Sequence, residues 1–306
     1  MKKWLIFVLL VLFALNSVEV FAQKKVKIGV SLPAADNPFF VRMREGIEDA
    51  VKKYNVEARI FVAGENQAKQ LSDCEDLIQS KVDALVFVPV DTQAAVPIVE
   101  NAVAAGIPVV DLNRRVQSDK YMVRIGSDDV MVGVRIGEFL AKKLNGKGNL
   151  VMLRGKAGAS VANQREEGLI SVINKYPGIK VIAKMANEHQ RAEGLRIMED
   201  LLQAHPKIDA AYCINDEVAL GAVGAIEAAK RKGILVTGID ANKDGLQAVR
   251  EGRMALTIAQ KPRLMGRMGI EYALKIINGE KVPKEVVTDI VVITPDNINT
   301  VDLSGN

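Results

Sequence analysis

Short apolar runs rich in β-branched residues alternate along the chain with longer segments in which apolar positions recur at helical spacing. This alternation is typical of parallel β-sheets covered by helices. In the first part of the chain the predicted strands are 26–32, 59–63, 84–88 and 109–112, and the predicted helices are 39–54, 67–80 and 96–105.

A second series repeats the first. It consists of predicted helices at 129–144, 161–175, 190–204 and 216–230, and predicted strands at 150–153, 181–185, 210–214 and 235–238. Because the chain passes through nearly the same order of elements twice, we expect an α/β protein with two similar, doubly wound parallel-sheet lobes. Their carboxyl edges should face each other across a cleft, where folds of this class bind small molecules.

The stretch 35–40 joins the first predicted strand to the first predicted helix. Asn37 suits the N-cap, and Pro38 suits the first helical position because its missing N–H would be unpaired there. Of Phe39 and Phe40, we expect one ring to pack inward and the other to present an apolar face beside the Asn37 amide. A sugar fits that combination, since its ring has an apolar C–H face and a rim of hydroxyls. The alternative is that both rings belong to the core.

Other loops that follow strands are rich in amides, carboxylates and guanidiniums. Such groups form hydrogen bonds to vicinal hydroxyls, and the charge-assisted bonds are the stronger ones. The loops predicted to converge are 37–40, 113–115, 155–165, 187–189, 215–217, 240–242 and 260–262.

The first 22 residues predict a cleavable secretory signal peptide. Lys2 and Lys3 precede an apolar run at 4–15, which is too short for a membrane span, and 20–22 fits a cleavage site. The mature chain should begin at Gln23. No Cys follows the apolar run, so a lipid anchor is not expected and the predicted location is the periplasm.

Composition and charge argue against several classes of function. The net charge of +4 over 306 residues is not gathered into a basic run, so nucleic-acid binding is not expected. Cys74 and Cys213 lie inside predicted elements and should be buried free thiols. With two histidines and no ligand spacing around them, neither a metal site nor a cofactor is expected.

Two classes of protein share parts of this pattern. A sugar-responsive repressor would carry a DNA-reading helix pair before the first strand, where this chain has its predicted signal peptide. A secreted hydrolase is suggested by 158–162, which resembles a nucleophile elbow without its final Gly, with His189 and His205 as candidate bases. Neither a GxxxxGK[ST] nor an HExxH motif is present, so catalysis is not expected.

The whole mature length resembles the periplasmic sugar-binding proteins of the ribose and galactose/glucose type, which serve ABC importers. The matching segments, in chain order, are 37–40, 113–114, 158–165, 204–206, 215–222, 238–240 and 259–260. The resemblance implies a type I periplasmic binding protein fold whose chain crosses between lobes near Gly126, Gln260 and Asp289. The implied N-terminal lobe is 23–126 with 261–289, and the implied C-terminal lobe is 127–260 with 290–306.

The resemblance also implies a ligand site, in which Phe39 or Phe40 stacks on a sugar and polar side chains hold its hydroxyls. The implied site residues are Asn37, Phe39, Phe40, Asn113, Arg114, Arg165, His189, Asn215, Asp240 and Gln260. The implied partners are a monosaccharide, the membrane subunits of an ABC importer and, for some members of the family, a chemoreceptor. The protein should act as a monomer.

Each implied role has a simpler structural alternative. Asp240 could cap the helix that begins after Asn242, and Asn215 could be an ordinary N-cap. Arg165 could pair with a neighbouring glutamate on a solvated face, and His189 could be an exposed loop residue.

Three positions depart from the ribose-binding pattern. Asn113 stands where ribose binders have Asp, His189 stands where the family usually has a second stacking ring, and Val88 replaces a polar residue. An amide and an imidazole can both donate hydrogen bonds. The cargo therefore stays open among pentoses, hexoses and cyclic polyols.

Overall fold

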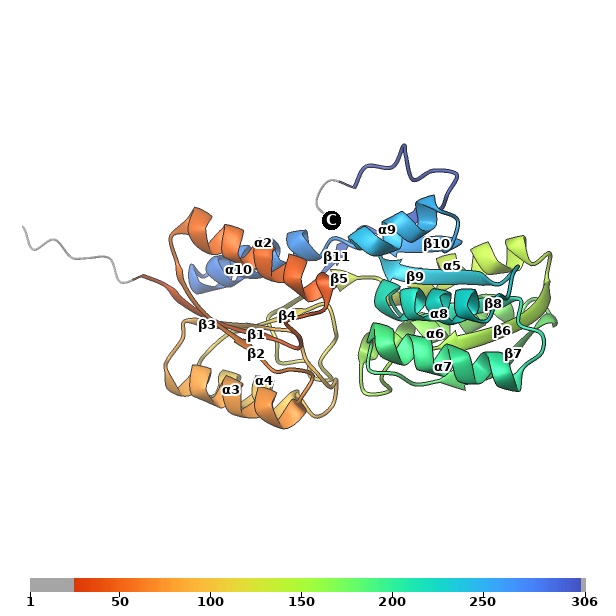
Figure 1. Cartoon of the computed structure of the whole chain (residues 1–306). Helices are drawn as coiled ribbons and strands as arrows, with labels where there is room; N and C mark the ends of the chain where they lie inside the picture. Colours follow the sequence, from red (N-terminus) through yellow and green to blue (C-terminus); the bar gives the residue numbers. More distant parts are fainter. Residues whose placement is uncertain (1–24, 304–306) are drawn as a thin grey trace, which may run out of the picture.

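Two six-stranded sheets organise residues 25–303, the part of the chain that the computed structural model describes (Figure 1). The predicted signal peptide lies outside these residues. The first sheet and its helices are called the N lobe here, and the second sheet and its helices the C lobe. The predicted fold class, with two doubly wound α/β lobes, is confirmed.

In the N lobe all strands are parallel. Their order across the sheet is β11 (Glu285–Thr288), β5 (Val123–Ser127), β4 (Val109–Leu112), β3 (Ala84–Phe87), β1 (Lys27–Leu32) and β2 (Glu57–Val62). The apolar side chains of β1, β3 and β4 are buried because helices cover both faces of the sheet. One face packs on α2 (Pro38–Tyr54) and α10 (Pro262–Ile277), and the other on α3 (Gln67–Gln79) and α4 (Val96–Ala104).

The C lobe repeats this arrangement, but its last strand runs antiparallel. The order is β12 (Val291–Ile293), β10 (Leu256–Ala259), β9 (Leu235–Asp240), β8 (Ala210–Cys213), β6 (Lys147–Leu153) and β7 (Gly178–Met185). One face packs on α5 (Asp129–Lys143) and α6 (Ser160–Ile173), and the other on α7 (Arg191–Ala204), α8 (Asp216–Ala228) and α9 (Lys243–Arg250).

The chain passes from one sheet to the other three times: between β5 and α5, between β10 and α10, and between β11 and β12. The first and third passages lie together, since the hydroxyls of Ser127 and Thr288 are 3.2 Å apart. These three passages are called the crossing segments below.

The lobes also meet away from the crossing segments. The Thr92 amide of the N lobe donates to the Gly158 carbonyl of the C lobe at 2.9 Å. The Arg115 amide donates to the Ser160 hydroxyl at 2.7 Å. A Cβ on Gly158 would lie 1.9 Å from a carboxylate oxygen of Asp91, so a larger residue there would require the Asp91 side chain to move. The structure is therefore a closed arrangement of the lobes.

Local signals in the sequence explain how the elements begin. Asn37 is the N-cap of α2, its side chain accepts from the Phe39 amide at 2.9 Å, and Pro38 opens the helix, as predicted. Cys74 in α3 and Cys213 in β8 are buried free thiols. Within residues 25–303, no helix combines the length and apolarity needed to cross a membrane.

Candidate functional site

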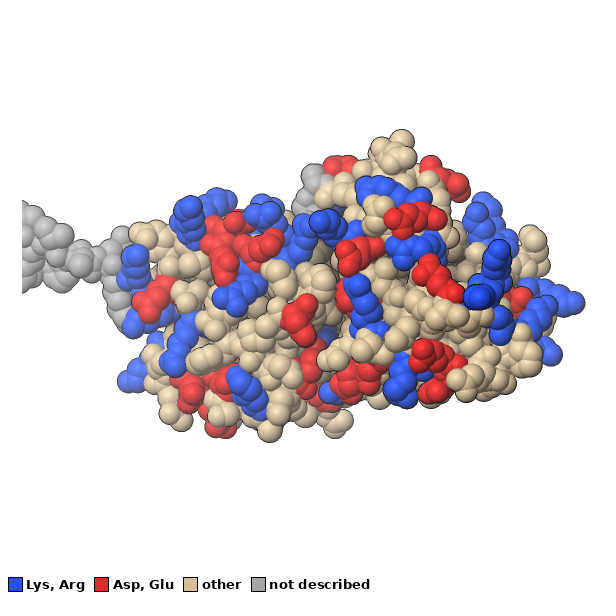
Figure 2. Space-filling model, viewed as in Figure 1, with Lys and Arg blue, Asp and Glu red and all other residues tan. Residues whose placement is uncertain are grey.

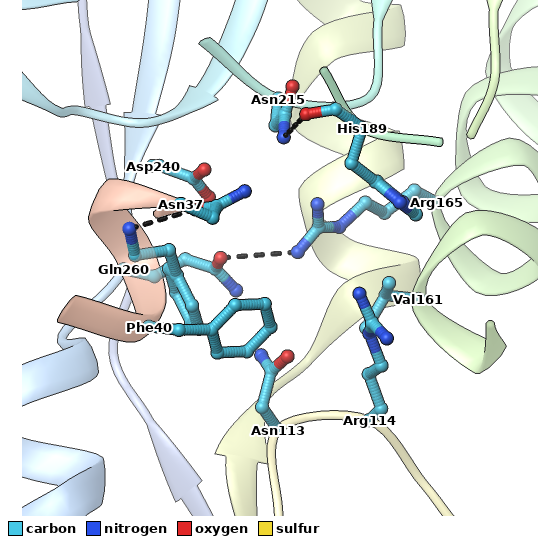
Figure 3. A pocket seen from close by; sticks show the side chains of 11 residues that line it. Asn37, Phe40, Asn113, Arg114, Val161, Arg165, His189, Asn215, Asp240 and Gln260 are labelled. Atoms are coloured by element: carbon cyan, nitrogen blue, oxygen red, sulfur yellow. Dashed lines mark hydrogen bonds between the residues drawn. The ribbon is translucent and has the colours of Figure 1, made fainter. Parts of the chain in front are cut away.

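A cavity of about 330 Å³ lies between the two lobes, at the carboxyl ends of the parallel strands (Figure 3). It is lined by Asn37, Phe39, Phe40, Asn113, Arg114, Val161, Arg165, His189, Asn215, Asp240 and Gln260. All ten residues predicted for the site are thus brought together, with Val161 as an addition. Every lining residue except Asn37 is buried.

Two aromatic rings form the N-lobe side of the cavity. Phe39 and Phe40 meet edge to face, with centroids 5.3 Å apart and ring planes at 87°. Both rings line the cavity and both also belong to the buried core of the N lobe. The expectation that only one ring faces the site is wrong for this arrangement, because the perpendicular packing lets both contribute to both environments.

Arg114 is held in place by a carboxylate outside the cavity. Its two terminal nitrogens donate to Glu65 at 3.0 and 2.8 Å, a bidentate pair, and its guanidinium carbon lies 5.3 Å from the centroid of Phe40. Glu65 has a φ of 55°, which directs it back toward the loop after β4. The sequence analysis did not identify Glu65.

Arg165 enters the cavity from α6 with three of its donors already used. Nε donates to Asp129 at 2.8 Å, Nη1 donates to the Ile214 carbonyl at 2.9 Å, and Nη2 donates to Oε1 of Gln260 at 3.1 Å. The alternative of a solvated pair with a neighbouring glutamate is therefore wrong. Burial, the largest single influence, lowers the pKa of Arg165, but the neighbouring Asp129 and other nearby groups, including Asp240, together raise that pKa above its usual value. Two N–H groups of the guanidinium remain for a ligand.

Asp240 is the last residue of β9 and has a strained backbone, with φ at 112°. The next residues are held by Asp216, which accepts from the Asn242 amide at 2.9 Å and from the Thr257 hydroxyl at 2.7 Å. Asn242, not Asp240, caps α9, so the capping alternative for Asp240 is wrong. Burial, and then the nearby Asp216 charge, raise the pKa of Asp240 well above its usual value. Hydroxyl donors would favour its ionised form.

The backbone of His189 is held by hydrogen bonds, whereas its ring nitrogens have no hydrogen-bond partner within residues 25–303. Its amide donates to Asn187 at 2.9 Å, its carbonyl accepts from Asn215 at 3.2 Å, and its φ is 66°. The residue is 8% exposed, so the exposed-loop alternative is wrong. Burial, and then the Arg114 charge, lower the pKa of His189 well below its usual value. A neutral imidazole presents one donor and one acceptor.

Asn215 combines its capping role with its place at the cavity. Its side-chain carbonyl oxygen accepts from the Val218 amide at 2.9 Å, so Asn215 is the N-cap of α8. The alternative that it is an ordinary N-cap is therefore confirmed for this oxygen. The same side chain lines the cavity and donates to the carbonyl of His189. It therefore fixes the His189 loop against the start of α8.

Several buried nitrogen atoms that line the cavity have no hydrogen-bond partner within residues 25–303. They are Nδ2 of Asn113, Nε2 of Gln260 and both ring nitrogens of His189. Buried polar atoms are normally paired, and a functional site is a common reason for an exception. Together with the Asp240 carboxylate and the remaining Arg165 donors, they offer a donor on the N-lobe wall and both donors and acceptors on the C-lobe wall. Hydroxyl groups, which donate and accept, match this set.

A second hollow of about 630 Å³, open to solvent, adjoins the cavity. Asn37 and His189 line both spaces, so the two spaces adjoin at these residues.

Catalytic and metal chemistry find no matching arrangement in the described part of the chain. The Ser160 hydroxyl of the elbow-like segment accepts from the Arg115 amide, and no bond between it and a histidine is present among residues 25–303. Within the same residues no group of three or more His, Cys, Asp or Glu side chains is placed to hold a metal ion. On the face in Figure 2, lysines and arginines are interspersed with acidic residues over both lobes.

Comparison with known proteins places this geometry in a wider group. The model of the family described as "Periplasmic binding protein domain" matches residues 28–281. The ribose import binding protein RbsB of Bacillus subtilis (strain 168) is 39% identical over 264 residues, which cover 86% of this chain and 86% of the relative.

Solved structures agree with this result. A solute-binding protein of an ABC transporter from Bacillus halodurans C-125, with bound myo-inositol, is 32% identical with a TM-score of 0.86, covering 90% of this chain and 96% of that one. A periplasmic solute-binding protein from Actinobacillus succinogenes 130z, with bound D-allose, is 30% identical with a TM-score of 0.85, covering 90% and 100%.

Proposed function

The chain belongs to the periplasmic binding protein domain family, whose members are solute-binding proteins and not enzymes, and from this premise we propose that it captures a monosaccharide between its lobes for an ABC-type importer. The observation that carries the proposal is the set of unpartnered polar atoms on both walls of one buried cavity. Hydroxyls on opposite edges of a sugar ring would bond both lobes at once. The rings of Phe39 and Phe40 would cover its apolar face.

The charged side chains around the cavity favour a neutral cargo. Both guanidiniums at the cavity already face a carboxylate, Arg114 through Glu65 and Arg165 through Asp129. The remaining ionisable group, Asp240, offers no positive charge in either protonation state, and in its ionised form it would repel an anion at close range. Neutral pentoses and hexoses therefore fit, whereas sugar acids and sugar phosphates do not.

A cyclic polyol is the second candidate for the cargo. The similar solute-binding protein from Bacillus halodurans C-125 has myo-inositol bound. In addition, a neutral His189 can bond a hydroxyl where a stacking ring would need an apolar face. Both features would suit a ring that carries hydroxyls all around.

We also propose the route of capture. Segments 23–126 with 261–289 and 127–260 with 290–306 would move as two lobes about the crossing segments, so that cargo enters an open cleft and is buried on closure. Cargo would favour closure because only the closed form lets both walls bond it. The protein would act as a monomer in the periplasm after removal of the signal peptide, and a chemoreceptor is a further candidate partner.

The test is a ligand screen on the chain from Gln23 onward, unfolded, dialysed and refolded to remove copurified cargo. Ribose, xylose, arabinose, glucose, galactose, allose and myo-inositol would be compared with gluconate and ribose 5-phosphate. A ligand of the folded state raises the unfolding midpoint with the logarithm of its concentration over Kd. We expect one or two neutral compounds to raise it and the anions to have no effect. Failure of every neutral compound, verified by calorimetric titration, would refute a monosaccharide or inositol cargo.

A further inference from the structure

A network of charged side chains, buried except at Glu285, runs behind the cavity and reaches all three crossing segments. Asp129, the first residue of α5, lies just after the first crossing and holds Arg165. Arg165 also donates to Gln260 at the second crossing. Arg124, on β5, donates to Glu285 of β11 at 2.7 Å, which leads to the third crossing. Arg124 and Asp129 do not line the cavity.

Arg124 connects the network to the N-lobe wall. Its Nη2 donates to the carbonyl of Asn113 at 2.7 Å, beneath the loop that presents Asn113 and Arg114 to the cavity. Asn113 has a φ of 56°, a conformation that needs such support. Gly126 makes room for the guanidinium, since a Cβ there would lie 2.9 Å from Nη2 of Arg124.

Arg124 and Asp129 face each other across the first crossing. Nη2 of Arg124 and Oδ2 of Asp129 are 3.8 Å apart, and the two side chains are 2% and 0% exposed. Oδ2 of Asp129 and Nε of Arg124 have no hydrogen-bond partner within residues 25–303. The pair is therefore held by charge attraction over a short distance in a dry environment, where screening is weak.

We propose that Arg124 and Asp129 are a positioning pair that couples the first crossing segment to the ligand site, with Arg124 fixing the Asn113 loop of the N lobe and Asp129 fixing Arg165 of the C lobe. Their attraction holds one ligand-facing group from each lobe in register when the lobes are closed. This inference rests on the proposed function of the cavity. It adds that cargo affinity depends on two residues that never touch the cargo.

The main test replaces Asp129 by Asn, which keeps the shape and an acceptor for Arg165 but removes the charge. We expect Asp129→Asn to weaken sugar binding about 30-fold, because Arg165 and Arg124 are then left as buried cations without the carboxylate between them. Calorimetric titration separates this from misfolding, since damaged protein lowers the number of sites whereas the proposal lowers the affinity of each site.

Asp128→Asn is the matched control. Asp128 is adjacent, exposed, and caps the same helix by accepting from the Met131 amide at 2.9 Å. An Asn there can still cap α5, so we expect an affinity within about twofold of wild type. Equal losses in Asp128→Asn and Asp129→Asn would refute the pair, since net charge at the start of the helix would then explain both.

A double-mutant cycle tests whether the two residues act together. If Arg124→Gln and Asp129→Asn break one coupled unit, the double variant should lose little more affinity than the worse single variant. Losses that multiply would refute the coupling. If Asp129→Asn does not fold, Gly126→Ala replaces it, since the added methyl displaces the Arg124 guanidinium. An unchanged affinity in Gly126→Ala would refute the role of Arg124.

A ligand-free measurement keeps this inference separate from the proposed function. The Nε–H signal of Arg165 in a ¹⁵N-correlated NMR spectrum, assigned with Arg165→Lys, should be protected from exchange in wild type and less protected in Asp129→Asn, because a neutral amide oxygen is a weaker acceptor than a carboxylate. If wild-type protein binds no compound of the screen, the proposed function fails. The Arg165 Nε–H signal can still test whether Asp129 fixes Arg165 as the positioning pair requires. An Arg165 signal that Asp129→Asn leaves unchanged would refute it.

Discussion

The N lobe faces the cavity with two aromatic rings and an arginine whose partner is partly open to solvent, whereas the C lobe faces it with a carboxylate, an imidazole and an arginine whose partner is fully buried. Side-chain exposure is 18% for Glu65 and 0% for Asp129. Both lobes use the same strand order, apart from the antiparallel β12. One scaffold can thus supply an apolar wall and a polar wall, because the chemistry resides in the loops after the strands.

The largest effect is expected from the polar wall. Asp240→Ala should reduce sugar affinity at least about 100-fold, because hydrogen bonds from two hydroxyls to a carboxylate contribute about 1.5–3 kcal/mol each. Calorimetric titration measures the change. Asp244→Ala, which removes an exposed carboxylate on α9 that pairs with Arg191, serves as the control and should bind normally. An Asp240→Ala protein with wild-type affinity would mean that the polar wall does not hold the cargo.

The pH dependence of stability should differ between the lobes. Burial raises the pKa of Asp111 in the N lobe to about 8 and that of Asp216 in the C lobe to about 7. Between about pH 4 and these values the folded carboxyl keeps a proton that the unfolded one has lost, so the free energy of unfolding falls as pH rises, by up to about 1.4 kcal/mol per pH unit and group.

Replacing each carboxyl by an amide should remove its share of that slope. Asp111→Asn should flatten the decline up to about pH 8, and Asp216→Asn only up to about pH 7. Urea denaturation at pH 5, 6, 7 and 8 measures both windows. Variant curves that run parallel to wild type across this range would contradict the assignment.

The apolar wall should show a smaller effect on binding. Phe40→Leu keeps much of the buried volume but removes the ring, and we expect an affinity loss of about tenfold, the scale of one stacking contact. Phe87→Leu is the matched control, since Phe87 is a fully buried ring of the same lobe that does not line the cavity. It should lower the unfolding midpoint without changing sugar affinity. Equal sugar affinity in Phe40→Leu and Phe87→Leu would show that stacking on Phe40 does not contribute to binding.

The smallest effect is expected where the arginine partner is partly open. Glu65→Gln should weaken sugar binding only about threefold. Solvent already screens the negative charge of Glu65 that this variant removes, and the contacts of Arg114 to the Pro89 and Val90 carbonyls persist. Titration beside Asp129→Asn sharpens the comparison of the two walls. A loss as large as that of Asp129→Asn would show that burial of the partner does not set its importance.

The sequence predicted the fold class and the residues that gather at the cavity because their signals are local. Asn37 and Pro38 mark the start of a helix, and residues that follow parallel strands meet at one sheet edge whatever the details of packing. That these residues bind a cargo stays a prediction. The strands β5, β10, β11 and β12 and the helix α10 were not among the predicted elements, since the strands are short and β5 and β11 carry charged residues.

The supporting carboxylates could not be found in this way. Glu65 lies 49 positions from Arg114, and Asp129 lies 36 positions from Arg165. Nothing near either residue indicates its partner, because the pairing depends on how helices and loops pack in three dimensions. The burial of Arg124 could not be predicted either, because an isolated arginine between apolar residues is usually a surface residue, whereas Arg124 is 2% exposed.

In the proposed closing movement, Gly158 and Asp91 mark a place where the two lobes come into contact. Backbone meets side chain there, and a methyl group at position 158 would push against the Asp91 carboxylate. A molecule that is one ring too large would keep the two lobes apart, and the Thr92 amide would then not reach the Gly158 carbonyl. On the proposed route of capture, this contact would act as a size check: an importer that recognises only the closed form would receive only cargo that fits between the lobes.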